Sequence, residues 1–181
     1  MNKKNCRKLN LGSGNVLKPD FINFDCVEIE RGGQKTDVIG RIEDVLSIFG
    51  PKRFDFILCS HVIEHFYRSD AAKVLADCLE LLKPSGTLLV EAPDISKVLD
   101  LYYNKKIGLE YVIECMYGIE AHRLKWGDWG VHSFPVQPRS GWTGKLLAEE
   151  MKRIGFVDVV VGDGTTHRHP ERDLRVTGKR G

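Results

Sequence analysis

The sequence has 181 residues, of which 42% are hydrophobic and 29% are charged. These proportions are those of an ordinary globular protein and exclude a disordered or fibrous chain. The 27 basic and 25 acidic residues are spread along the chain. A nucleic-acid-binding protein would usually show a clustered basic patch, so we expect no nucleic-acid partner. The length suits one hydrophobic core, and we predict a single domain over residues 1–181.

The cysteines and the N-terminus indicate the cellular compartment. The five cysteines are odd in number and form no C-x-x-C pair, which is typical of a reduced intracellular protein. No apolar segment follows the basic N-terminus, and no run approaches the roughly 18 apolar residues of a membrane-spanning helix. We therefore expect a cytoplasmic protein, monomeric or homodimeric, with no membrane partner.

The N-terminal part of the chain begins with a short apolar run that ends at Gly12-Ser13-Gly14. Glycines directly after a buried strand let the backbone turn tightly and approach a ligand. A second apolar run, Ile22 to Asp25, follows a turn at Lys18-Pro19-Asp20. The segment between the two runs has no room for the crossover helix that parallel strands normally require. Asp25 ends the second run, where an acidic side chain can accept hydrogen bonds from ribose hydroxyls.

The remaining pattern alternates between strand-like and helix-like segments. Strands are predicted at 37–39, 54–59, 87–92, 156–161 and 173–177, and helices at 42–49, 71–83, 95–118 (one or two helices) and 143–154. Thr143 is a plausible N-cap of the last helix, and Gly155 is placed to end it. Alternating units predict an α/β fold with a mostly parallel, doubly wound sheet covered by helices on both faces. The last two strands, with no helix between them, predict an antiparallel hairpin.

One segment has no sustained period. Residues 120–142 contain all three tryptophans (Trp126, Trp129 and Trp142) and His132. A loop of this length in a compact domain is usually functional. We interpret it as a lid that selects the acceptor of a reaction.

Several motifs in the same order resemble the class I S-adenosylmethionine-dependent methyltransferases, and most closely their compact small-molecule and glycan-modifying branch. The motifs are LNLGSG, NFD, FDFILCSHVIEHF, LLKPSGTLLVEAP and the terminal RIGFVDVVVGDG…RDLRVTGK. The resemblance implies a Rossmann-like, three-layer α-β-α fold with a seven-stranded sheet of order 3-2-1-4-5-7-6 and an antiparallel seventh strand. It also implies S-adenosylmethionine as cofactor and S-adenosylhomocysteine as product.

By resemblance, the residues of the cofactor site lie at the ends of the first four strands. The backbone of the glycine turn would contact the methionine portion, and Asp25 the ribose. Ile42 and Glu43 would lie near the adenine, and the residues after the fourth strand near the sulfonium. The full set is Asn10, Leu11, Gly12, Ser13, Gly14, Asp25, Ile42, Glu43, Cys59, Ser60 and His61.

Three positions depart from the family pattern. Asn10 replaces the usual acidic residue of the glycine motif, and Val16 replaces its third glycine. Arg41 stands where relatives often have an aspartate near the adenine amine. An asparagine accepts a hydrogen bond but does not offset the positive charge of the cofactor, so these departures leave open a module that binds the cofactor without catalysis.

His61-Val62-Ile63-Glu64-His65 also matches H-x-x-E-H, a zinc hydrolase motif in which two histidines share one face of a helix. A zinc-dependent hydrolase is therefore a further alternative, although the segment follows a strand end and no separate acidic ligand stands out. Within the methyltransferase pattern we expect no metal site. Glu64 and His65 would support the loop that holds the cofactor, and His61 could act as a general base because imidazole titrates near neutral pH.

The expected reaction transfers the methyl group to an oxygen or nitrogen of a small-molecule or glycan-type acceptor. His61 or His132 would remove the proton from a hydroxyl acceptor. Trp126, Trp129, His132 and Trp142 are the candidate substrate-binding residues, because aromatic faces stack on sugars and planar groups. The alternative for the tryptophans is ordinary core packing, since large aromatics are mostly buried.

Overall fold

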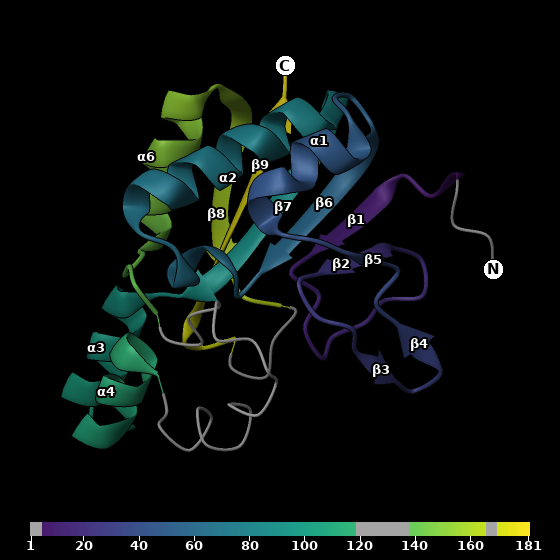
Figure 1. Cartoon of the computed structure of the whole chain (residues 1–181). Helices are drawn as coiled ribbons and strands as arrows, with labels where there is room; N and C mark the ends of the chain where they lie inside the picture. Colours follow the sequence, from purple (N-terminus) through teal and green to yellow (C-terminus); the bar gives the residue numbers. More distant parts are fainter. Residues whose placement is uncertain (1–4, 119–137, 166–169) are drawn as a thin grey trace.

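A computed structural model gives the structure of the chain and describes residues 5–118, 138–165 and 170–181. Its elements alternate between strands and helices along the chain (Figure 1). In order they are β1 (Lys8–Leu11), β2 (Ile22–Asp25), β3 (Glu30–Arg31), β4 (Gln34–Lys35), β5 (Val38–Ile39), η2 (Ile42–Asp44), α1 (Val45–Phe49), β6 (Phe54–Ser60), η3 (Ile63–His65), α2 (Arg68–Leu81), β7 (Leu82–Pro93), α3 (Ile95–Tyr103), α4 (Leu109–Tyr117), α6 (Gly144–Ile154), β8 (Phe156–Asp163) and β9 (Asp173–Arg180).

One seven-stranded sheet has the order β5-β2-β1-β6-β7-β9-β8. The strands from β5 to β7 pair in parallel, while β9 runs antiparallel to both β7 and β8. Numbered along the chain without the small hairpin β3-β4, this is the order 3-2-1-4-5-7-6. The predicted Rossmann-like α/β class, the strand order and the antiparallel last strand are confirmed.

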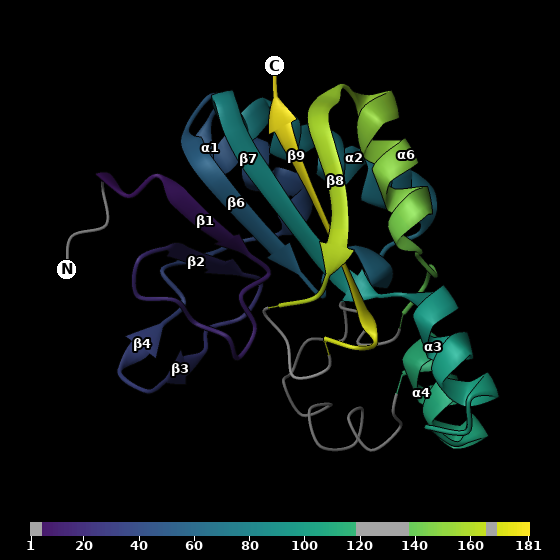
Figure 2. The ribbon, with the colours of Figure 1, turned by 180° about the vertical axis from the view of Figure 1, so that it is seen from behind.

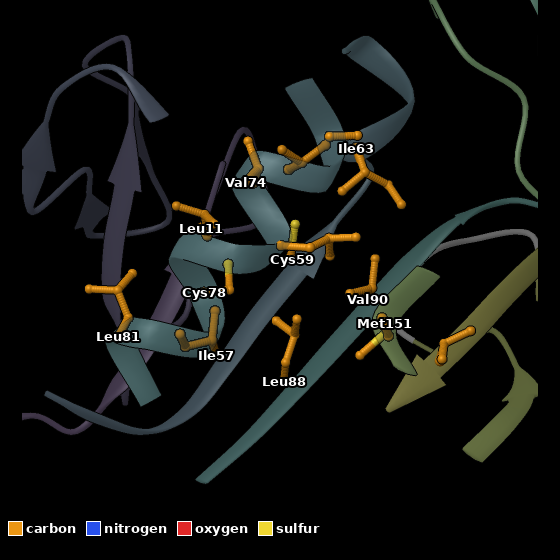
Figure 3. Close-up of a cluster of buried hydrophobic side chains, with 14 of the residues drawn as sticks. Leu11, Ile57, Cys59, Ile63, Val74, Cys78, Leu81, Leu88, Val90 and Met151 are labelled. Atoms are coloured by element: carbon orange, nitrogen blue, oxygen red, sulfur yellow. The ribbon is translucent and has the colours of Figure 1, made fainter. Parts of the chain in front are cut away.

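The main hydrophobic core lies between the sheet and the helices α1, α2 and α6. All three helices lie on the same face of the sheet, in front of it in Figure 1 and behind it in Figure 2. Strand side chains that point to this face are fully buried, among them Ile57, Leu88 and Val90. They meet Val74 and Leu81 of α2 (Figure 3).

The opposite face carries no helix within the described ranges, and the strands lie in front of the helices when the molecule is viewed from that side (Figure 2). The connections explain this difference from the expected three layers. Residues 12–21 join β1 to β2 as a loop, and the hairpin β3-β4 replaces a helix between β2 and β5. A helical crossover needs a dozen or more residues, which the first connection lacks.

Cross-strand register shows which residues line this open face. One row runs across Leu58, Leu89, Thr177 and Val160, which pair in turn along β6, β7, β9 and β8. Paired residues point to the same side of a sheet. Val160 is 61% exposed, whereas Leu58 is only 3% exposed. On the open face, side chains are therefore exposed toward the β8 edge and buried toward the centre of the sheet.

The junction of α2 and β7 differs from the prediction of a helix to Lys83 and a strand from Thr87. The helix ends at Leu81, and β7 begins at Leu82. Pro84 explains the early end, because a proline ring clashes with a preceding helical turn. Ser85 has φ of +63° and the pairing with β6 shifts there, so the first part of β7 contains an irregularity.

Helix α6 begins and ends as predicted. The Thr143 hydroxyl accepts a hydrogen bond from the Leu146 amide at 3.2 Å, and Gly155 has φ of +118°. This is an N-cap and a left-handed C-terminal residue. Helices α3 and α4 form a separate pair beneath the sheet (Figure 1), with a small core of Val98, Val112 and Cys115. In the described parts of the chain, every helix is too short or too polar to cross a bilayer.

Candidate active site

The carboxyl ends of β1, β2 and β6 meet at one edge of the sheet. Leu11 pairs with Phe24 on one side and with Cys59 on the other. The glycine turn, Asp25 and the segment from Cys59 to His61 therefore lie at the same edge, as expected for a doubly wound sheet that binds its ligand there.

The glycine turn has a backbone that ordinary residues rarely adopt. Gly12 has φ of +65° and Gly14 has φ of +46°. A Cβ on Gly12 would lie 2.5 Å from Val62 Cγ2, so the turn is in close contact with the segment after β6. The Ser13 amide donates to the Phe24 carbonyl at 3.0 Å, which fastens the turn to the end of β2.

Asp25 connects the turn with the end of β2. Its Oδ2 accepts a hydrogen bond from the Gly14 amide at 2.7 Å, and its Oδ1 accepts from the Cys26 amide at 2.8 Å. Oδ1 also accepts from the Cys26 thiol at 3.3 Å and from the Val27 amide at 3.4 Å. A carboxylate oxygen has about two lone-pair sites, so the remaining acceptor capacity is on Oδ2. The half-buried Cys26 thiol has a pKa raised to about 12, first by burial and then by the charge of Asp25.

The next strand brings two further expected cofactor residues to this side. The Gly40 amide, just after β5, donates to the Asp25 carbonyl at 3.0 Å. Ile42 follows at the start of η2 and is 8% exposed. Glu43 pairs with Arg41 at 3.1 Å. The structure thus brings Asp25 and the start of η2 together at one end of the edge.

Asn10 and Ser13 are both buried, but they differ in their partners. The Asn10 side-chain amide (Nδ2) donates to the Val16 carbonyl at 2.8 Å and to Asn23 Oδ1 at 3.0 Å. These bonds hold the loop after the glycine turn. The Ser13 hydroxyl is buried and has no hydrogen-bond partner among the described residues.

His61 directly follows β6 and is the last of the expected cofactor residues. Its ring lies between two carboxylates. It has φ of +55°. Its Nδ1 lies 3.1 Å from Glu64 Oε1, and its Nε2 lies 3.1 Å from Asp173 Oδ2. Burial lowers the pKa of His61, but the two carboxylates outweigh burial and raise it to about 9. His61 is therefore an imidazolium at neutral pH, which has no lone pair with which to take a proton. This geometry does not favour the base role that we expected for it.

Asp173 was not among the site residues expected from the sequence. It is fully buried at the start of β9, and its Oδ1 accepts from Arg172 Nε at 2.7 Å. It lies 112 positions from His61 in the chain. Only the antiparallel direction of β9 signals the contact, since it places the first residue of that strand at the carboxyl edge of the parallel strands.

The last residues of the expected acceptor segment dock on the turn after β6. The amides of Arg139 and Ser140 donate to the Glu64 carbonyl at 2.7 and 3.1 Å. Trp142 is 2% exposed and belongs to the main core, with the Arg68 guanidinium 4.9 Å from its ring centroid. The indole thus has the core-packing position that was the alternative to substrate contact.

Three other expected residues, Trp126, Trp129 and His132, lie outside the described residues, as does most of the 120–142 segment. Their roles stay predictions.

The H-x-x-E-H segment does not form the helix of a zinc hydrolase. His61 ends an extended segment with a positive φ, and Ile63–His65 is a single 3-10 turn. The two histidines therefore do not lie one turn apart on an α-helix, which the motif requires. Both ring nitrogens of His61 already face carboxylates. In the described part of the chain, no three His, Cys, Asp or Glu side chains are arranged so that they could hold a metal ion.

An open, mostly parallel sheet with a glycine turn after its first strand and an acidic residue after its second defines a Rossmann-like fold that binds a nucleotide-containing cofactor. A family model described as a methyltransferase domain matches residues 6–161. The chain belongs to this methyltransferase family. No curated protein matches the chain at a significant level.

Solved structures of methyltransferases share the fold. A SAM-dependent methyltransferase from Archaeoglobus fulgidus is 14% identical, with a TM-score of 0.57 over 96% of this chain and 86% of that one. A possible histamine N-methyltransferase from Thermotoga maritima is 16% identical, with a TM-score of 0.58 over 97% and 82%.

A third structure, of 1,6-didemethyltoxoflavin-N1-methyltransferase from Burkholderia thailandensis, contains S-adenosylhomocysteine. It is 16% identical, with a TM-score of 0.57 over 96% of this chain and 70% of that one. The resemblance to the class I S-adenosylmethionine-dependent methyltransferases is confirmed.

Proposed function

We propose that this protein transfers a methyl group from S-adenosylmethionine to an oxygen or nitrogen of a small-molecule or glycan-type acceptor. The observation that carries the proposal is the glycine turn, whose Gly14 amide binds the Asp25 carboxylate 2.7 Å away at the carboxyl edge of the sheet. A backbone that a ligand can approach closely, beside a carboxylate that can accept a ribose hydrogen bond, supports the proposal because such a cofactor requires both.

The residues at this edge fit the cofactor chemically. Gly14 leaves the backbone open to the methionine portion, because no atom lies within 4 Å of a Cβ built on it. The unpartnered Ser13 hydroxyl offers a further polar group. Asp25 Oδ2, which accepts only the Gly14 amide among the described residues, retains a lone pair for a ribose hydroxyl. We assign the adenine side to Ile42 and Glu43 and the sulfonium side to the segment from Cys59 to His61.

Methyl transfer asks the protein mainly to align two reactants and to exclude water. The cofactor, when bound, supplies the electrophilic methyl group. The acceptor must approach from the side of His61, where the buried carboxylates of Glu64 and Asp173 border the end of β6. If the acceptor is a hydroxyl, we assign proton removal to His132, because His61 is already protonated. Trp126 and Trp129 are the proposed acceptor contacts.

Calorimetric titration with S-adenosylhomocysteine tests the cofactor site. We expect binding to the wild-type protein and at least about a tenfold weaker affinity for Asp25→Ala, because a ribose hydrogen bond to a charged group is lost. Asp44→Asn, which alters an exposed carboxylate nearby, is the matched control and should bind as the wild type does. Absence of binding to the wild type would refute the proposal.

The second candidate function is a cofactor-binding module without catalysis. Asn10 favours this second function. Its side-chain amide donates to the Val16 carbonyl and to Asn23, and an asparagine brings no negative charge to the site. Transfer of a labelled methyl group from S-adenosylmethionine into small-molecule extracts separates the two candidates. The enzyme is supported if labelled product forms and if His132→Ala abolishes it while S-adenosylhomocysteine still binds. The module is supported if the protein binds S-adenosylhomocysteine but transfers no label.

A further inference from the structure

His61 joins segments that are far apart in the chain. Its ring contacts Glu64 in the turn after β6 and Asp173 at the start of β9, each at 3.1 Å. Its own amide donates to the Glu91 carbonyl in β7 at 2.8 Å. Because only 20% of its side chain is exposed, these contacts are largely shielded from water. The imidazolium thus connects the turn after β6 to β9, and the His61 main chain adds a connection to β7.

Glu64 carries this connection to the docked segment 138–142. Its carboxylate holds His61, while its main-chain carbonyl accepts both the Arg139 and the Ser140 amides. Glu64 is 5% exposed, and its second carboxylate oxygen has no partner among the described residues. A displacement of the Glu64 side chain would therefore move the carbonyl on which residues 138–142 depend.

Asp173 carries the connection to α3 in the same way. Its Oδ1 accepts from Arg172, and its main-chain carbonyl accepts from Lys97 Nζ of α3 at 2.8 Å. The Arg172 carbonyl in turn accepts from the Asp94 amide at 3.0 Å, directly before α3. Asp173 thus connects β9 to His61 through its carboxylate and to α3 through its main-chain carbonyl.

The carboxylates of Glu64 and Asp173 can both accept a hydrogen bond from the His61 ring only when the ring is protonated. Among the described residues, Arg172 lies on Asp173, and His65 is the other titratable group beside Glu64. A neutral imidazole can donate only one hydrogen bond. Loss of the proton would leave one buried carboxylate facing a lone pair, which is unfavourable in a site shielded from water.

We propose that Glu64 and Asp173 are positioning residues that act through the His61 imidazolium, holding the turn 61–65 and the docked residues 138–142 at the place where the acceptor meets the methyl donor. The role in catalysis rests on the proposed methyl transfer, whereas the mechanical connection does not. Neither carboxylate is expected to touch the cofactor.

Nuclear magnetic resonance of the full chain tests the connection without an acceptor. In the wild type, the His61 ring should titrate near pH 9, and the Arg139 and Ser140 amide signals should be lost to exchange over the same pH range. The amides of Ile57 and Val90 in the core strands should persist. Asp173→Asn should lower the pKa of His61 by about one to three units and raise exchange of the two docked amides at pH 7 by about tenfold or more.

Asp163→Asn is the control, since it removes a carboxylate that pairs with Lys97 but does not contact His61. It should leave the His61 titration and the two amides unchanged. Docked amides that stay protected after His61 loses its proton would overturn the proposal, and this wild-type measurement decides the matter even if Asp173→Asn does not fold. Binding of S-adenosylhomocysteine, measured separately, tests the proposed function and does not depend on this result.

Discussion

The two faces of the sheet are built from neighbouring residues but do different work. Leu88 and Leu89 follow one another in β7; Leu88 is fully buried under the helices, whereas Leu89 on the open face is only half-buried. The covered face holds the apolar core that stabilises the fold. The open face results from short connections around β1 and β2, the same strands that carry the glycine turn. The helices that are absent from the open face of the described chain are thus the ones that would connect the strands of the proposed cofactor site.

The difference also shows what holds the proposed cofactor residues in place. No helix directly follows the glycine turn in the described chain, and the turn is held by a hydrogen bond to β2 and by its contact with Val62. The proposed acceptor side is held instead by buried charges around His61. Apolar packing therefore stabilises the covered face, backbone geometry shapes the glycine turn, and buried charges hold the residues around His61.

The sharpest test of the two faces is the pair Leu88→Ala and Leu89→Ala. We expect Leu88→Ala to lower the free energy of unfolding by about 2–5 kcal/mol, because it leaves a cavity in the core. Leu89→Ala should cost less than about 1.5 kcal/mol, since less apolar area is lost. Urea denaturation of both variants measures this. Equal losses would show that the open face is packed as tightly as the covered one.

The pH dependence of stability separates the charged edge from both faces. The pKa of His61 is raised from 6.5 to about 9, so its contribution is fully present below pH 6.5 and is lost as the pH rises to about 9. The expected loss is about 3 kcal/mol. Urea denaturation between pH 6 and 8.5 measures most of it, before ionisation of the cysteine thiols in the unfolded chain adds an effect of the same sign. The slope should be absent in His61→Asn; an identical slope there would contradict the assignment.

The smallest effect is expected on the exposed part of the open face. Val160→Lys changes a residue that is 61% exposed, and the free energy of unfolding should stay within about 0.5 kcal/mol of the wild type. Thermal and urea denaturation provide the measurement. Destabilisation by several kcal/mol would mean that Val160 is buried against something in solution, and the contrast between the faces would then be weaker than described.

Much of the fold follows from local sequence signals. The glycine turn, the Thr143 and Gly155 caps and the alternation of strands and helices all depend on residues close together in the chain. The motif order then supplied the strand order through the family resemblance. The small hairpin β3-β4 was not among the predicted strands, because strands of two residues are too short to show a period.

The charged part of the site could not be predicted in the same way. The partnership of His61 with Asp173 joins two strands through tertiary pairing, and no local pattern encodes it. The sequence indicated His61 as a base from its residue type alone. Its protonation depends on two carboxylates whose positions only the three-dimensional structure gives.

The contact between Gly12 and Val62 has a consequence for how this sequence can change over evolutionary time. Any side chain at position 12 would collide with Val62, because its Cβ would lie 2.5 Å from Val62 Cγ2, well inside van der Waals contact. A smaller residue at position 62 would relieve the collision but not the strain of the positive φ at position 12. The two positions are therefore expected to drift together among descendants of this chain, with glycine at 12 the slower to be replaced.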